Sequence, residues 1–151
     1  MSPSGFAELR TALDLLIKLR HDMQRMQSLP EDQYAAFDFF ITAEHIVDWL
    51  HPRDKDARRM LRAANPLLRV TSHLASGAKH FHVQDARHRS VIATEKVRYV
   101  ERDYVEEGYF ADPLIISLTA EEAAALDCER TIEAVKLGRR ILEFWEDKFK
   151  P

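Results

Sequence analysis

The stretch EDQYAAFDFFITAEHIVDWLH, residues 31–51, decides the fold of this chain. At about 100° per residue, apolar and aromatic side chains cover most of the circumference of a helix drawn through it. These side chains are Tyr34, Phe37, Phe39, Phe40, Ile41, Ile46, Val47, Trp49 and Leu50. A helix that is apolar on most sides is buried at the centre of a protein. We therefore expect a helical domain built around residues 31–51, which the His–Pro pair at 51 and 52 brings to an end.

The polar side chains of this central helix are candidates for a buried site. They form two stripes, one of Asp38, Thr42 and His45 and the other of Glu44, Asp48 and His51. We expect Asp38, His45 and Asp48 to contact a ligand. The alternative for His45 is a buried structural role, with a hydrogen bond to Asp38 or Thr42.

Amphipathic patterns predict helices on both sides of the central one. A helix over residues 4–28 begins at the cap Ser4 and carries a broad apolar face. That face comprises Phe6, Leu9, Leu13, Leu16, Ile17, Leu19 and Met23. It either packs in the core of a bundle or forms the interface of a homodimer. A short basic helix over residues 54–63 follows the central one, with Asp54 as its cap.

Another helix begins at Asn65 and Pro66, because proline is tolerated at a first helical position. It extends to about Phe81 or Val83. Its apolar face is separate from a polar stripe in which four side chains lie within about 60° of one another. These are Arg69, His73, Ser76 and His80.

Residues 90–118 show a different pattern. β-Branched and aromatic residues alternate in part in VRYVERDYV (97–105) and in LIISL (114–118), with turn-forming residues between them. This pattern predicts a two-stranded hairpin with a long acidic loop. A lone hairpin is marginal in water, so we expect it to pack against the helices.

The final helix is predicted over residues 119–149, with a break near Asp127. Thr119 and Glu122 fit a capping box at its start. The predicted fold is therefore mainly α: a single domain over residues 1–151, formed by a bundle of four or five helices with a small β-hairpin inserted before the C-terminal helix.

The distribution of charge points to an anionic partner. The whole chain has a net charge of -3, but residues 51–102 contain 12 Lys and Arg against 5 Asp and Glu. Five of the seven histidines also fall in this basic segment. Such segregation favours RNA or another anionic ligand as the partner of the basic segment. The alternative is that the acidic flanks neutralise the basic segment within the fold.

Other classes of protein are excluded by simple features of the sequence. A single cysteine, Cys128, allows no internal disulfide framework. No apolar run approaches the roughly 18 residues that a membrane span needs. The first ten residues, MSPSGFAELR, do not show the pattern of a secretory signal. We expect a cytoplasmic protein that does not associate with a membrane.

The basic segment supplies two sets of candidate site residues. Arg58, Arg59 and Arg62 are expected to contribute to a surface that contacts phosphate groups. His80, His73, Arg69 and Lys79 form the candidate catalytic set, in which an imidazole transfers a proton and a cation holds a phosphate. A solvated polar face is the alternative for this second set.

A metal site between the helices is a further hypothesis, with His45 and His73 or His80 as ligands together with carboxylates of the central helix. The sequence contains no His-x-x-x-His or Glu-x-x-His spacing. We therefore expect no metal ligands and no cofactor.

Three pieces of the chain resemble a group of small bacterial proteins of similar length. They are FDFFITAEHIVDWLHP (37–52), VTSHLASGAKHF (70–81) and ILEFWEDKF (141–149). The shared patterns are His-x-x-Asp-Trp, Gly-x-Lys-His-Phe and a terminal Phe-Trp. The resemblance covers most of the chain and implies a helical fold without implying an activity.

A more distant similarity is to the HEPN superfamily of helical bundles, many of which are dimeric, metal-independent ribonucleases. It implies that His80 acts as a general acid or base and that Lys79 or Arg69 stabilises the phosphorane charge. The arginine of the family signature is missing, because positions 73–75 before His80 are His, Leu and Ala.

Together these observations favour a cytoplasmic bacterial domain that binds a partner or anionic ligand through its basic, His-rich region without catalysis. A HEPN-like endoribonuclease of a toxin, defence or mobile-element system is the first alternative. A metal-binding helical bundle is the second.

Overall fold

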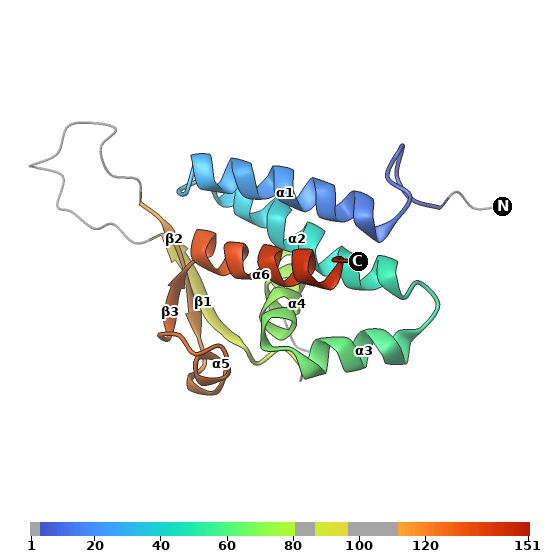
Figure 1. Cartoon of the computed structure of the whole chain (residues 1–151). Helices are drawn as coiled ribbons and strands as arrows, with labels where there is room; N and C mark the ends of the chain where they lie inside the picture. The colour runs from blue at the N-terminus through green and yellow to red at the C-terminus, as the bar shows by residue number, and fades with distance from the viewer. Residues whose placement is uncertain (1–3, 81–86, 97–111) are drawn as a thin grey trace, which may run out of the picture.

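The computed structural model describes residues 4–80, 87–96 and 112–151 (Figure 1). In these residues the helices are α1 (Ala12–Ser28), α2 (Gln33–Leu50), α3 (Lys55–Ala64), α4 (Pro66–Lys79), α5 (Ala120–Ala125) and α6 (Ala134–Lys148). The strands are β1 (Val91–Lys96), β2 (Leu114–Leu118) and β3 (Thr131–Glu133). The protein is mainly helical, with a small antiparallel sheet before the C-terminal helix, as predicted. The expected bundle of four or five helices is corrected to six helices and three strands within the described residues.

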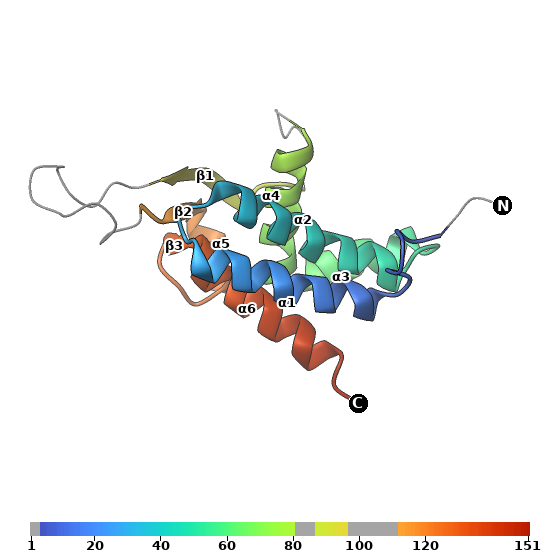
Figure 2. The ribbon, with the colours of Figure 1, turned by 90° about the horizontal axis from the view of Figure 1, so that it is seen from above.

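Helix α2 occupies the centre of the core, as its apolar circumference predicts. Phe39, Ala43, Ile46 and Val47 on this helix are fully buried. Helices α1, α4 and α6 all pack against α2. The sheet lies at one end of this helical layer and α3 lies at the other end (Figures 1 and 2).

The predicted hairpin is present and is extended by a third strand. β1 pairs with β2 in antiparallel register from Val91↔Leu118 to Lys96↔Leu114. The segment 97–105, which was predicted to form the first strand, lies outside the described residues. β3 pairs with the other edge of β2, so the strand order is β1-β2-β3.

The first helix begins later than predicted. Ser4 is not its cap, because Gly5 and Ala7 have φ angles of 81° and 51° and a short bridge joins Phe6 to Leu9. Thr11 caps α1 instead and forms a capping box with Asp14. This local set of hydrogen bonds fixes the start of the helix.

The buried face of α1 is also rotated from the predicted one. Leu16, Leu19 and Met23 are buried as expected, whereas Leu13 and Ile17 are 50% and 55% exposed. The buried positions extend to Ala12, Leu15, Asp22 and Met26. The face of α1 therefore contains one acidic residue, Asp22, among apolar ones.

The caps of α3 and α4 confirm the predicted helix starts. The Asp54 side chain accepts a hydrogen bond from the Ala57 N–H at 2.8 Å. The Asn65 side chain accepts one from the Leu67 N–H at 2.9 Å, and Pro66 occupies the first turn of α4. These caps set the direction in which α4 runs past α2.

The final predicted helix is divided into α5, β3 and α6. The break falls at Asp127, which has a φ angle of 50°, in the left-handed region. Thr119 caps α5 by accepting a hydrogen bond from the Glu122 N–H. The break allows Thr131–Glu133 to pair with β2 before the chain enters α6.

Candidate ligand-binding pocket

A polar pocket of about 460 Å³ lies between α2 and α4. We call it the α2–α4 pocket. Its lining residues are Ile41, Glu44, His45 and Asp48 from α2 and Ser72, Ala75, Ser76, Lys79 and His80 from α4. Its volume lies within the range of roughly 300 to 1,000 Å³ that is usual for small-molecule sites. Two of the helices that the sequence placed near a candidate site therefore line one pocket.

The open side of the pocket carries His45, Lys79 and His80. All three side chains are exposed. Within the described part of the chain, none of them forms a hydrogen bond or an ion pair. The pocket therefore presents one lysine and two imidazoles whose polar atoms are available to a ligand.

Glu44 forms the most buried polar group of the pocket, with a side chain that is 15% exposed. Its Oε1 atom lies 2.6 Å from Nη2 of Arg62 on α3. Its Oε2 atom and the Nε atom of Arg62 are buried and have no hydrogen-bond partner among the described residues. Burial raises the pKa of Glu44 to about 7, against the opposing charge and hydrogen bond of Arg62. Near neutral pH the Glu44 carboxyl therefore exists in both protonation states.

Asp48 connects the pocket to the basic helix α3. Its Oδ1 atom accepts a hydrogen bond from Nη2 of Arg62 at 2.9 Å. The Nε atom of Arg58 lies 3.5 Å from the same oxygen. Arg58 and Arg62 thus stand behind the carboxylates of the pocket, and neither lines it.

Three arginines of α3 are paired with acidic residues. Arg59 pairs with Asp56 on the surface of α3. Arg58 and Arg62 pair with Asp48, and Arg62 also pairs with Glu44. Neutralisation of the basic segment by its acidic flanks, one of the two alternatives from the sequence, therefore applies to Arg58 and Arg62, whereas Asp56 belongs to the segment itself.

Arg69 and His73 lie away from the α2–α4 pocket. Two nitrogens of Arg69 bond the buried Glu122 at 2.8 and 3.1 Å. Nδ1 of His73 accepts hydrogen bonds from the backbone N–H groups of Ser90 and Val91 at 3.1 and 3.0 Å. His73 also lines a separate hollow of about 690 Å³ between α2, α4 and β1. His73 therefore holds the start of β1 against α4, and Arg69 holds α5 against the same helix.

The four candidate catalytic residues therefore do not form one set. Lys79 and His80 line the α2–α4 pocket, whereas His73 and Arg69 do not. All lie on α4, but Arg69 and His80 are separated by about 16 Å of helical rise. Side chains that share a stripe in projection thus reach different neighbours.

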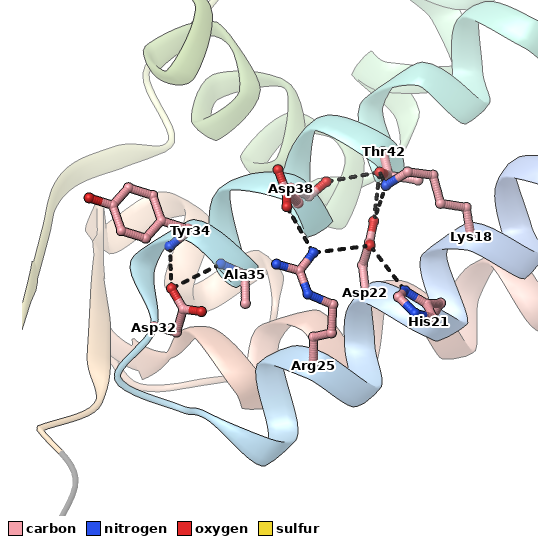
Figure 3. Close-up of polar contacts among 9 residues, drawn as sticks. All are labelled: Lys18, His21, Asp22, Arg25, Asp32, Tyr34, Ala35, Asp38 and Thr42. Atoms are coloured by element: carbon pink, nitrogen blue, oxygen red, sulfur yellow. Dashed lines mark hydrogen bonds and ion pairs between the residues drawn. The ribbon is translucent and has the colours of Figure 1, made fainter. Parts of the chain in front are cut away.

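The stripe of Asp38, Thr42 and His45 is also divided. Asp38 accepts a hydrogen bond from Nη1 of Arg25 at 2.8 Å, on the side of α2 that faces α1 (Figure 3). The Thr42 hydroxyl donates to Asp22 at 2.8 Å. Only His45 of this stripe lines the α2–α4 pocket.

Asp22 is a buried polar residue that sequence reasoning missed. Its side chain is 3% exposed and receives hydrogen bonds from Lys18 and Thr42 (Figure 3). Arg25 and His21 each approach it at 3.8 Å. The available signal was its place three residues after Leu19, within the apolar face of α1. Asp22 does not line the α2–α4 pocket, and it joins α1 to α2.

The described residues contain no group of three or more His, Cys, Asp or Glu side chains that could hold a metal ion. Their helices also include none with the length and apolar character that crossing a membrane requires.

Comparisons with known protein families, with curated proteins and with solved structures found no match. The function of this chain must therefore be inferred from its own side chains.

Proposed function

We propose that this chain binds a small anionic ligand in the α2–α4 pocket without catalysing a reaction on it. The observation that supports this proposal is the presence of three unpaired basic or titratable side chains, His45, Lys79 and His80, in one pocket. A lysine with three free donors and two imidazoles suits a phosphate or carboxylate group.

The α2–α4 pocket suits a small anionic ligand better than a nucleic acid. A nucleic-acid surface requires several cations that follow the phosphate backbone. Arg58, Arg62 and Arg69 are instead engaged with Asp48, Glu44 and Glu122. Lys79 and the two imidazoles lie in one pocket, which favours one anionic group of limited size.

Titration of the full chain with inorganic phosphate tests this proposal. We expect saturable binding that perturbs the imidazole signals of His45 and His80 in NMR spectra. Lys79→Ala should weaken binding by about 10- to 100-fold, because a charged hydrogen bond contributes roughly 1.5–3 kcal/mol. Lys136→Ala is the matched control, since Lys136 pairs with Glu133 outside the pocket. Absent binding, or an equal loss in both variants, would contradict the proposal.

Metal-independent RNA cleavage is a second candidate function. It is favoured by the observation that His45 and His80, an acid–base pair in principle, line the same pocket as Lys79. Purified protein should then cleave single-stranded RNA in the presence of a metal chelator. His80→Ala and His45→Ala should each abolish cleavage while preserving the circular dichroism spectrum. RNA that stays intact with the wild-type protein would rule out this candidate.

A further inference from the structure

We infer that the ligand of the α2–α4 pocket is a monophosphate ester of a small sugar, with its phosphate at Lys79 and His80 and its hydroxyl groups at Asp48, beside the buried Glu44. This inference rests on the proposed function and adds the chemical class of the ligand. It follows from the unequal chemistry of the two ends of the pocket.

One end of the pocket carries the basic groups. Lys79 and His80 are adjacent at the C-terminal end of α4, and both are exposed and unpaired within the described residues. No ion pair of the described chain neutralises Lys79. A phosphate group, with several acceptor oxygens, satisfies more of these donors than a carboxylate does.

The other end carries carboxyl groups. Ser72 of α4 and Glu44 of α2 both line this end. The Oε2 atom of Glu44 is buried without a partner, and the side chain of Asp48 is 44% exposed. Carboxyl oxygens accept hydrogen bonds, and a protonated carboxyl also donates one. Sugar hydroxyls both donate and accept, so they match the exposed Asp48 carboxylate and the Ser72 hydroxyl, beside the buried carboxyl of Glu44.

The distance between the two ends excludes several smaller ligands. Ser72 and His80 are separated by about 12 Å of helical rise along α4. An α-amino acid carries its amino and carboxylate groups on one carbon and cannot reach both ends. A ligand with an anionic group at each end would place one charge beside Asp48, which is unfavourable. A phosphate on a hydroxylated chain or ring satisfies both ends.

Parallel titrations with inorganic phosphate, ribose 5-phosphate and ribose test this inference. We expect ribose 5-phosphate to bind at least tenfold more tightly than phosphate, and ribose to bind more weakly than either. Glu44→Gln and Asp48→Asn should each lower the ratio of ribose 5-phosphate affinity to phosphate affinity, because both variants change the carboxyl end of the pocket. Lys79→Ala should weaken the binding of both phosphates. Melting curves of each variant establish that it is folded, and the two carboxyl variants provide independent tests.

The outcomes separate this inference from the proposed function. Equal affinity for phosphate and ribose 5-phosphate would overturn the sugar phosphate and leave the anion site in place. Unchanged preference in both carboxyl variants would also overturn it. Failure of both phosphates to bind would overturn the inference together with the proposed function.

Discussion

Glu44 and Arg62 form an ion pair between α2 and α3, with 2.6 Å between Oε1 and Nη2. Each partner nevertheless retains one buried polar atom without a hydrogen bond among the described residues. An interior ion pair that is only partly satisfied contributes little to stability, because desolvation offsets the attraction between its charges. Burial also raises the pKa of Glu44, so the contribution of this pair to stability depends on pH.

Glu44→Gln should change how stability depends on pH. The pKa of Glu44 rises from 4.5 to about 7 on folding, so the native state retains a proton that the unfolded chain releases. Stability from this group is full below pH 4.5 and is lost as the pH rises through 7. The advantage of wild type over Glu44→Gln should therefore fall by about 3 kcal/mol across this interval. Urea unfolding at several pH values measures this change in stability. Glu143 is exposed, so the control variant Glu143→Gln should show no such trend.

His73→Ala should destabilise the protein by about 1–3 kcal/mol at pH 7.5, because two backbone N–H groups lose their acceptor. Burial, assisted by the charge of His88, lowers the pKa of His73. The stability from His73 is therefore present above its unfolded pKa and is lost as the pH falls. The difference between wild type and variant should shrink on acidification from pH 7.5 to 5. His21→Ala, at a side chain that is 70% exposed, serves as the control.

Asp22→Ala should destabilise the protein by about 1–3 kcal/mol, because Lys18 and the buried Thr42 lose their shared acceptor. Asp38→Ala removes the neighbouring contact with Arg25, in which both side chains are more than 40% exposed. That loss should be below about 1 kcal/mol. Chemical denaturation measures the free energy of unfolding of both variants. Equal losses of stability would contradict the expectation that the buried contacts of Asp22 contribute more than the exposed contact of Asp38.

Asp127→Gly should stabilise the protein by up to about 1 kcal/mol. Asp127 has a φ angle of 50°, which a glycine adopts without a steric penalty. The greater flexibility of an unfolded chain with glycine offsets part of this gain. Asp147→Gly in α6 should instead cost about 1 kcal/mol, since glycine weakens a helix. A lower melting temperature for Asp127→Gly would contradict this expectation.

The sequence predicts those elements that are specified locally. The apolar circumference of residues 31–51 identifies α2, and Asp54 and Asn65 identify the starts of α3 and α4. The strand β3 was not predicted, because Thr131–Glu133 becomes a strand only by pairing with β2. Ser4 was predicted as the cap of α1, and that prediction was wrong because Gly5 and Ala7 turn the chain before Thr11, which is the cap.

The candidate site is also predicted only in part, because some of its expected residues have partners in distant segments. His45, Lys79 and His80 were identified as site residues, and they share a pocket. Arg69 and His73 were assigned to the same site because helical projection ignores where each residue lies along the axis. Their actual partners, Glu122 and the backbone of Ser90 and Val91, come from distant segments that periodicity cannot place.

Gly138 on α6 shows how tightly three helices meet. A Cβ atom at this position would lie 2.4 Å from Cε of Met26 and 3.2 Å from Cε1 of Phe39. Because Met26 and Phe39 are themselves buried, a larger residue at 138 would force the end of Met26 and the ring of Phe39 to repack. The absent side chain of Gly138 therefore sets how closely the C-terminal helix approaches the first two helices.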